Sequence, residues 1–394
     1  MELLSYRTLG TEASLSRRMP ERVLQFGDGN FLRGFVDDFI DQMNEKADFD
    51  SSVVIVPPAS TGKTGRINRQ DGLYQLYLRG RLNGQVVDQR RLIRCISRAL
   101  DVFTQWRELL DFVCSDELRF VISNTTEAGI VYDPACRFDD CPPASFPAKL
   151  TRLLWQRWYA GKPGLILLPC ELIADNGTVL RDTVLRHAAD WALEEDFLHW
   201  LREENRFCNT LVDRIVTGYP AAQAPRLNAE NGYEDALLDT AEPFGLWVIE
   251  GDEALSREFP AQKAGLPVKF VADHHPYKEQ KVRILNGGHT SMVLAAYLAG
   301  HNIVRECMED EAVRAYLEGA LFQEIIPTLS LPREDCEAFA RAVEERFANP
   351  YIDHRLLDIA LNSVSKWRAP VPPPGPAHPG KTGGAAGAQV PPLP

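Results

Sequence analysis

Short apolar runs that alternate with helical stretches dominate the first two thirds of the chain. Residues 22–26 form one such run and end at the turn Gly27–Asn30, after which apolar residues recur at helical spacing as far as Met43. A second apolar run, 53–56, ends at two consecutive prolines. The order strand, glycine turn, helix, strand predicts a βαβ unit that opens a doubly wound α/β sheet.

The same pattern continues downstream. Further buried strands are expected at 118–122, 165–168 and 246–249, with helices at 101–114, 147–159 and 178–204. A different signal lies at Asn83-Gly84, which is flanked by the strand-like segments 74–78 and 85–87. This pair suits a type I′ turn, so we expect an antiparallel hairpin to interrupt the first domain.

From about residue 274 onward the pattern is almost wholly helical. The expected helices cover 277–300, 309–324, 334–347 and 352–366. We therefore predict an N-terminal arm at 1–20, an α/β domain at 21–255, a mainly α-helical domain at 274–368, and a boundary near 255–273. Residues 369–394 contain 9 Pro and 5 Gly, which predicts a disordered tail; a proline-rich SH3-type ligand is the alternative.

Composition narrows the function classes. The 394 residues include 43 Lys and Arg against 55 Asp and Glu, a net charge of −12, which argues against a nucleic-acid partner because no basic excess is present. The sequence shows no apolar run of about 20 residues and no signal-peptide pattern, so we expect a cytoplasmic protein without a membrane span. The eight cysteines are scattered and are expected to be buried or incidental thiols.

The first candidate chemistry is the glycine turn. Gly27 and Gly29 follow a strand and open a helix, an arrangement in which the backbone can approach a pyrophosphate at a helix N-terminus. The third glycine of the dinucleotide fingerprint is replaced by Leu32, and Arg33 either faces a phosphate or lies in solvent. An ordinary strand-to-helix turn is the alternative interpretation. The acidic ribose-binding residue is not evident, so the choice between NAD and NADP stays open from this motif.

The second candidate site lies on the helix expected after Pro276, with Asp273 as its cap. At 100° per residue of an α-helix, Asn286 and His289 lie about 140° and 80° from Lys281, so an amine, an amide and an imidazole share one face. This set suits hydride transfer from a secondary alcohol, with Lys281 as base, Asn286 as oxyanion donor and His289 orienting the oxygen. A solvated lysine and a structural histidine are the alternatives.

Three weaker signals accompany these two. Gly287-Gly288 inside a helix implies a close approach, because each glycine costs about 1 kcal/mol there. The polar segment 123–129 follows a buried strand, where cofactors bind at the edge of a sheet, and Asp213-Arg214 is a pair that is either functional or only structural. His274-His275 lacks a third ligand at helical spacing, so we expect no metal site.

Several blocks of this sequence resemble the long-chain polyol dehydrogenase family, which includes mannitol, mannonate and tagaturonate/altronate dehydrogenases. The resemblance covers about residues 20–368. It is carried by LQFGDGNFLRGF at 24–35, SNTTEAGI at 123–130, CELIADNG at 170–177, CNTLVDRIVTGYP at 208–220, LDTAEPF at 238–244, PYKEQKVRILNGGH at 276–289 and NPYIDHRLLDIALN at 349–362.

The resemblance implies an NAD-dependent oxidoreductase that interconverts a keto sugar acid and its alcohol, tagaturonate and altronate in the branch that matches best. It implies a Rossmann domain, a helical domain, an active site in the cleft between them and no metal. The family pattern K-x4-N-x2-H falls on Lys281, Asn286 and His289, and Lys366 matches a substrate-pocket lysine. Cofactor binding carries over to Leu24, Gln25, Phe26, Gly27, Asp28, Gly29, Asn30, Phe31, Leu32, Arg33, Gly34, Phe35, Asn124 and Asp213.

Two departures from the family pattern bear on activity. Mannitol-type relatives have Cys-Asp-Asn where this chain has Cys170-Glu171-Leu172, a change shared by the tagaturonate branch, which puts a second oxyanion amide in question. The similarity also stops near Arg368, so the helical domain is expected to be incomplete. The alternatives are therefore a remnant that binds dinucleotide without turnover, and a sibling dehydrogenase for fructuronate, mannonate or mannitol.

Overall fold

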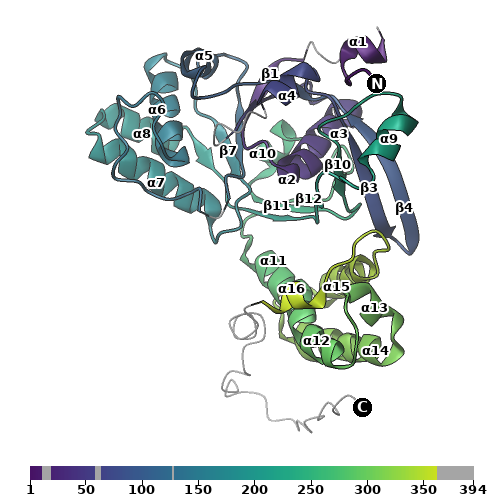
Figure 1. The fold of residues 1–394 in the computed structure, drawn as a ribbon. Coiled ribbons are helices and arrows are strands. Elements are labelled where there is room, and N and C mark those ends of the chain that lie inside the picture. The colour runs from purple at the N-terminus through teal and green to yellow at the C-terminus, as the bar shows by residue number, and fades with distance from the viewer. Residues whose placement is uncertain (11–18, 58–63, 127, 362–394) are drawn as a thin grey trace, which may run out of the picture. The chain divides into compact units, whose positions relative to one another are not determined.

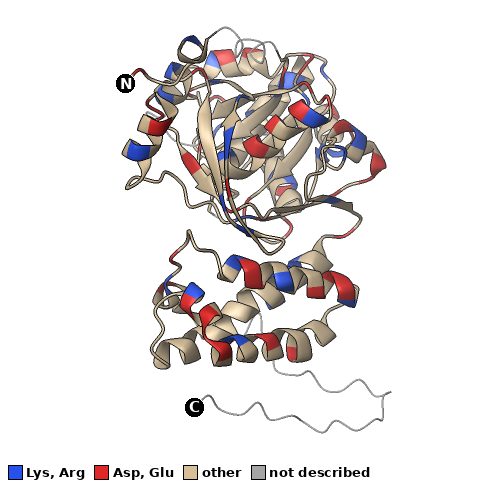
Figure 2. Ribbon diagram, turned by 90° about the vertical axis from the view of Figure 1, so that its right-hand side faces the viewer, with Lys and Arg blue, Asp and Glu red and all other residues tan. Residues whose placement is uncertain are grey.

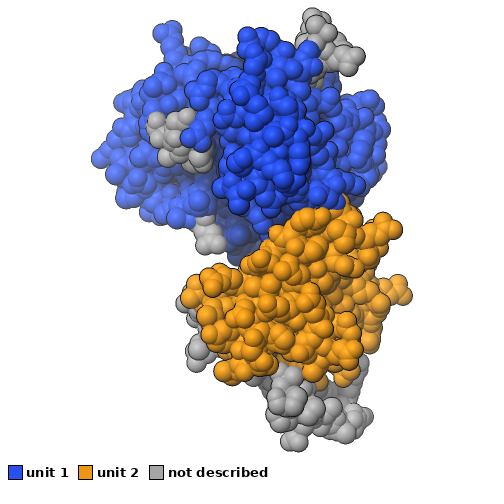
Figure 3. Space-filling model, turned by 45° about the vertical axis from the view of Figure 1, so that its right-hand side comes forward, with its two compact units in different colours: residues 1–79, 88–274 blue, residues 80–87, 275–394 orange. Residues whose placement is uncertain are grey.

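The computed structural model describes residues 1–10, 19–57, 64–126 and 128–361 (Figure 1). Lys366 and the Pro/Gly-rich segment 369–394 lie outside the described residues. The chain divides into two compact units, coloured separately in Figure 3. Unit 1 comprises residues 1–79 and 88–274, and unit 2 comprises residues 80–87 and 275–394.

Unit 1 is built on a six-stranded sheet. Its strand order is β5-β2-β1-β6-β7-β8, and every neighbouring pair runs parallel. The strands are β1 (Glu21–Phe26), β2 (Ser52–Val56), β5 (Ile96–Ala99), β6 (Phe120–Ser123), β7 (Ile166–Pro169) and β8 (Arg206–Phe207). Counted along this sheet alone, the order is 3-2-1-4-5-6, that of a doubly wound dinucleotide-binding fold. The α/β fold class expected from the sequence is confirmed.

Both faces of this sheet are buried, because side chains alternate between two hydrophobic cores. Val53 and Ile55 of β2 belong to one core, whereas Val54 and Val56 belong to the other. The first core is covered by the helical segment that follows β1, and the second by helices between later strands. These elements are α2 (Asn30–Leu32), η2 (Arg33–Asp37) and α3 (Asp38–Lys46) on one face, and α5 (Trp106–Phe112), α6 (Phe146–Tyr159), α7 (Asn176–Asp190) and α8 (Glu195–Glu203) on the other.

The single helix expected at 178–204 is wrong, since the structure has two. α7 ends at Asp190 and α8 begins at Glu195, with Ala192 at a φ of 51° between them. The indole of Trp191 donates a hydrogen bond to the Cys136 carbonyl oxygen at 3.0 Å, which ties this corner to a distant loop. A long-range contact therefore lies at the corner where this segment, helical throughout in its local pattern, divides into two helices.

Two smaller sheets complete unit 1. One has the order β12-β11-β9, from β9 (Thr210–Asp213), β11 (Leu246–Glu250) and β12 (Val268–Val271), so the strand expected at 246–249 lies outside the main sheet. The other has the order β10-β3-β4, from β3 (Tyr74–Leu82), β4 (Gln85–Ile93) and β10 (Asp239–Ala241). The remaining helices are α1 (Tyr6–Leu9), α4 (Thr64–Arg69), α9 (Ala224–Asn231) and α10 (Glu253–Glu258).

The turn between β3 and β4 has the expected geometry. Asn83 and Gly84 have φ values of 52° and 77°, both positive as a type I′ turn requires. The tip of this hairpin, residues 80–87, groups with unit 2, where the Gly84 amide donates to Oε1 of Glu345 at 2.6 Å. The sequence predicted the hairpin but not that its tip packs with the helical unit.

Unit 2 is mainly helical in its described part, as expected. One long helical segment runs from α11 (His275–Gln280) through η3 (Lys281–Asn286) into α12 (Gly287–Leu298). It is followed by α13 (Val304–Glu309), α14 (Glu311–Gly319), η4 (Ala320–Ile325), η5 (Ile326–Thr328), α15 (Arg333–Phe347) and α16 (Leu356–Ala360). α13 was not expected, and α16 is shorter than the predicted helix at 352–366, whose last residues lie outside the described part.

Acidic and basic side chains are interspersed on the helices of both units (Figure 2). Six of the eight cysteines are buried, and all eight are free thiols, as the sequence predicts. Among the helices of the described residues, none combines the length and the apolar character needed to cross a membrane.

Candidate functional site

The glycine turn after β1 leaves no space for a side chain at its first glycine. Gly27 has a φ of 130°, and its amide donates to the Val56 carbonyl oxygen at 2.9 Å. A Cβ at this position would lie 2.9 Å from the Asn124 carbonyl oxygen and 2.7 Å from Cδ1 of Leu32. The turn therefore needs glycine both for its backbone conformation and for its packing.

The second glycine, Gly29, has open space around it, in contrast to the closely packed Gly27. Gly29 directly precedes the helical segment, with φ −70° and ψ 161°, and a Cβ there would meet nothing within 4 Å. Gly29 and Asn30 are exposed, whereas Asp28 is buried. The first amides of a helix lack partners within the helix, so this open approach fits an anionic group such as a pyrophosphate.

The close-packing role of the missing third glycine falls on Gly34. A Cβ at Gly34 would lie 2.8 Å from Cγ1 of Val216, so the segment η2 approaches the Val216 region closely only because residue 34 is glycine. Leu32, at the fingerprint position, packs against Gly27 instead. η2 is a π-helical turn, and such turns occur frequently at functional sites.

The side chain of Arg33 is buried and hydrogen-bonded to other residues of unit 1. Its side chain is 7% exposed, and its guanidinium donates to the Leu237 carbonyl oxygen and to Oδ1 of Asn30. The carboxylate of Asp239 lies 4.0 Å away. Of the two alternatives for Arg33, exposure to solvent is thus wrong, and the contacts that the structure shows connect the glycine turn to β10 and the residues just before it.

Asn124 lies where the strand order reverses, between β1 and β6. Its amide donates to the Phe26 carbonyl oxygen at 3.0 Å, and its Nδ2 donates to the Cys170 carbonyl oxygen at 3.1 Å. In open α/β sheets, ligands bind outside the carboxyl ends of the strands at this switch point. The sheet topology therefore brings Asn124 and Gly27, which are nearly a hundred residues apart, to one edge.

The hydrogen bonds of Arg214 go to residues other than its neighbour Asp213. Asp213 is the last residue of β9 and is buried. The guanidinium of Arg214 donates to Oδ2 of Asp38 at 2.8 Å and to the carbonyl oxygens of Gly34 and Phe244, both at 2.9 Å. Arg214 thus anchors the helical segment after the glycine turn, which is a structural role.

The lysine, asparagine and histidine of unit 2 lie on one helical segment, but not on an ideal α-helix. Lys281 to Asn286 form the π turn η3, whose hydrogen bonds span five residues instead of four. A π turn has more residues per turn than an α-helix, so two side chains five positions apart point in more similar directions. The 140° separation between Lys281 and Asn286, which holds for an α-helix, is therefore too large here. Lys281 is half-buried, and Asn286 is exposed.

His289 lies in an aromatic environment that the sequence did not reveal. Its ring stacks on Phe347 of α15, with centroids 4.2 Å apart and an interplanar angle of 13°, and meets the ring of His354 edge-on at 5.4 Å. Gly288 lies among Leu317, Leu321 and Phe347, where a Cβ would make ordinary contacts at 3.5–3.7 Å. At Gly288, the close approach that two helical glycines implied is thus ordinary packing between helices.

After β7 the chain has Leu172 where the family has asparagine, so this position offers no side-chain amide to an oxyanion. Leu172 is 61% exposed, and the Glu171 carboxylate is buried within unit 1, where it accepts hydrogen bonds from Ser123, the last residue of β6, and from Thr125. The sequence pointed to Glu171 only as a departure from the family pattern. Its contacts with the segment 123–125 became visible only in the fold.

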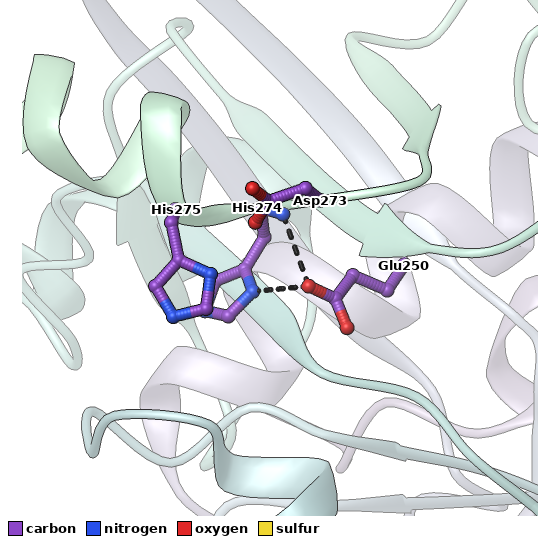
Figure 4. A group of neighbouring side chains, drawn as sticks. All are labelled: Glu250, Asp273, His274 and His275. Carbon is purple, nitrogen blue, oxygen red and sulfur yellow. Dashed lines mark hydrogen bonds and ion pairs between the residues drawn. The ribbon is translucent and has the colours of Figure 1, made fainter.

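His274 is buried beside a carboxylate. Its Nδ1 lies 2.6 Å from Oε1 of Glu250, and its backbone amide donates to the same oxygen at 3.0 Å (Figure 4). Burial by itself raises the pKa of Glu250, but the hydrogen bonds from His274 and Asn209 outweigh it and lower that pKa. Glu250, Asp273 and His274 belong to a group whose potential ligand atoms lie within 4.8 Å of one another, a grouping that sequence spacing did not show. The absence of a bound metal stays a prediction.

Comparison with known protein families gives two adjacent matches. Residues 21–263 match the model described as the mannitol dehydrogenase Rossmann domain, and residues 273–373 match the mannitol dehydrogenase C-terminal domain. The chain is 49% identical over 373 residues to proteins named altronate oxidoreductase from Escherichia coli, for example from strains O7:K1 and O9:H4. The alignment covers 93% of this chain and 77% of those relatives.

Two solved structures are similar over most of the chain. A D-sorbitol dehydrogenase in substrate-free form aligns with a TM-score of 0.80 at 26% identity, covering 93% of this chain and 79% of that one. A Pseudomonas fluorescens mannitol 2-dehydrogenase, solved as a ternary complex with NAD and D-mannitol, aligns with a TM-score of 0.72 at 26% identity, covering 91% and 76%.

Proposed function

The chain belongs to the mannitol dehydrogenase family of oxidoreductases, and from this premise we propose that it interconverts D-tagaturonate and D-altronate by NAD-dependent hydride transfer. The substrate assignment is supported by the 49% identity to proteins named altronate oxidoreductase. The cofactor assignment is supported by the NAD-bound mannitol 2-dehydrogenase with a similar fold.

The residues of unit 1 fit a dinucleotide. The helical segment has an open N-terminal end at Gly29, where a Cβ would meet nothing within 4 Å, beside the closed turn at Gly27, and this end would hold the pyrophosphate. The proposed cofactor contacts are the segment Leu24–Phe35, with Asn124 at the switch point and Asp213 at the end of β9. NAD(H) held by these residues would accept or supply the hydride of the reaction.

The residues of unit 2 supply the proton chemistry. Lys281, as a neutral amine, removes the hydroxyl proton of the alcohol while the hydride leaves its carbon, and in the reverse direction it returns that proton to the carbonyl oxygen. The Asn286 amide donates to the oxygen as negative charge develops on it, and the His289 imidazole orients that oxygen. The stacking of His289 on Phe347 supports this role because it restricts the orientation of the imidazole ring.

The single observation that carries the proposal is the π turn at Lys281–Asn286. Lys281 and Asn286, which match the family's lysine and asparagine, are five residues apart in a helical turn whose hydrogen bonds also span five residues. An ordinary α-helix would separate the two side chains by about 140°. The unusual turn therefore coincides with the two residues that the reaction requires to act on one oxygen.

The test is oxidation of NADH, followed at 340 nm, with tagaturonate, fructuronate and fructose as acceptors. We expect turnover with tagaturonate, and a loss of at least about 100-fold in kcat for Lys281→Ala, the lower range of general-base contributions. Arg283→Ala is the matched control, because its guanidinium lies in the same turn but binds Glu279 and Thr328. An unchanged rate in Lys281→Ala, or a preference for fructuronate or fructose, would refute the assignment.

A further inference from the structure

Glu171 directly follows the edge of the main sheet where the cofactor is proposed to bind. It comes two residues after the end of β7, and its side chain is 2% exposed. Its Oε1 accepts hydrogen bonds from the backbone amide of Thr125 at 2.9 Å and from Oγ1 of Thr125 at 3.0 Å, and its Oε2 accepts one from Oγ of Ser123 at 3.0 Å. One carboxylate therefore binds three donors, one on the last residue of β6 and two on Thr125 in the segment that follows it.

The segment that Glu171 binds has a conformation that its residues disfavour. Thr126 has a φ of 77°, which is rare for a β-branched residue. Gly129 packs so closely on Thr125 that a Cβ at residue 129 would lie 2.0 Å from Oγ1 of Thr125. Such backbone strain persists only where the surroundings hold it, and it is concentrated at ligand-binding and active sites.

The same segment is joined directly to the glycine turn. The carbonyl oxygen of Asn124 occupies the space that a Cβ of Gly27 would need, at 2.9 Å, and the amide of Asn124 donates to the carbonyl oxygen of Phe26. Ser123 and Thr125, the two residues bound by Glu171, flank Asn124 on either side. A shift of this segment would therefore displace both Asn124 and the wall of the glycine turn.

We propose that Glu171 is a positioning residue for the dinucleotide, holding the segment Ser123–Thr126 in the conformation that binds the cofactor. Glu171 acts through Asn124 and the glycine turn, without contacting the reacting atoms. The inference rests on the proposed function, because it concerns the cofactor of that same reaction. It assigns a cofactor-positioning role to a residue that the family pattern marks only as a departure.

The test compares NADH binding, measured by the quenching of protein fluorescence, in the wild type and in Glu171→Ala. We expect the dissociation constant for NADH to rise about tenfold in Glu171→Ala, equivalent to about 1.4 kcal/mol. In turnover, the KM for NADH should rise by a similar factor, whereas kcat at saturating NADH should change by less than about threefold. The split follows because Glu171 affects binding of the cofactor and not the proton-transfer groups.

Two further variants separate positioning from simple stabilisation. In Glu171→Gln, the amide oxygen still accepts from Thr125 and the NH2 group donates to Ser123, whose hydroxyl can also accept, so NADH binding should stay within about threefold of wild type. Asp41→Ala removes another buried carboxylate, one that accepts the Arg94 amide at 2.8 Å, and serves as the control for lost stability. It should lower the melting temperature without weakening NADH binding.

Several results would overturn the inference. One is a dissociation constant in Glu171→Ala equal to that of the wild type, and another is an increase in Asp41→Ala as large as that in Glu171→Ala. Failure of the proposed function looks different, because a wild type that binds NADH but does not reduce tagaturonate refutes the substrate assignment and leaves the Glu171 comparison intact. A wild type that binds no NADH refutes both.

Discussion

Replacement of Gly27 by alanine is expected to destabilise unit 1 strongly. The φ of 130° lies where L-residues are strained, at about 1–3 kcal/mol. The added methyl would also lie 2.9 Å from the carbonyl oxygen of Asn124, a backbone atom that moves only if the segment after β6 moves. Overpacking of this kind costs about 1–3 kcal/mol, so we expect a total loss of about 2–6 kcal/mol.

Gly29→Ala is the matched control, because it adds the same methyl two residues later. The φ of −70° accepts alanine, and the methyl would meet nothing within 4 Å, so stability should change by less than about 1 kcal/mol. NADH binding should nevertheless weaken by tenfold or more, because the methyl occupies the approach to the helix N-terminus. Chemical denaturation by urea measures the first quantity, and fluorescence titration with NADH measures the second.

The two variants together test whether Gly27 is required for stability and Gly29 for binding of NADH. A Gly27→Ala variant whose free energy of unfolding stays within about 0.5 kcal/mol of the wild type, the range of neutral surface substitutions, would contradict the strain and overlap expected at residue 27. A Gly29→Ala variant that binds NADH as tightly as the wild type would refute the binding role of Gly29. A loss of stability in both variants would show that the open surroundings of Gly29 were misjudged.

The remaining predictions concern buried charges of unit 1. Arg214→Met should lower the free energy of unfolding by about 2–4 kcal/mol in urea denaturation, because it leaves Asp38 buried without one of its partners, and Asp38→Asn in the same chain should recover part of that loss. Burial raises the pKa of Asp37 to about 7, so between about pH 4 and 7 the folded state holds a proton that the unfolded state releases, and stability falls as the pH rises through this window. Asp37→Asn should therefore gain stability relative to the wild type from pH 4 to 7; a constant difference between the two proteins across this range would contradict the prediction.

Local signals were sufficient for the elements that carry the candidate site. The strand, glycine turn and helix at 22–43 and the Asn83-Gly84 turn follow from apolar periodicity and from the φ values that glycine and asparagine tolerate. These preferences act within a few residues of the chain, so they can be inferred from the sequence without knowledge of the tertiary structure. The spacing of Lys281, Asn286 and His289 on one helical segment belongs to the same class of information.

What local signals could not decide was which distant groups meet. Arg33 has the pattern of a solvated or phosphate-facing side chain, yet it is buried against the Leu237 carbonyl oxygen, about 200 residues away. Likewise, Glu171 binds Ser123 and Thr125 only because β6 and β7 are neighbours in the sheet.

The sequence by itself thus determined the secondary structure around the glycine turn and the residue types available for hydride transfer. The tertiary structure decided their environment: the partners of Arg33, the π turn at Lys281, and the carboxylate that holds the segment after β6. The physical reason is that burial and hydrogen-bond partners depend on contacts between residues far apart in the chain, which no local pattern encodes.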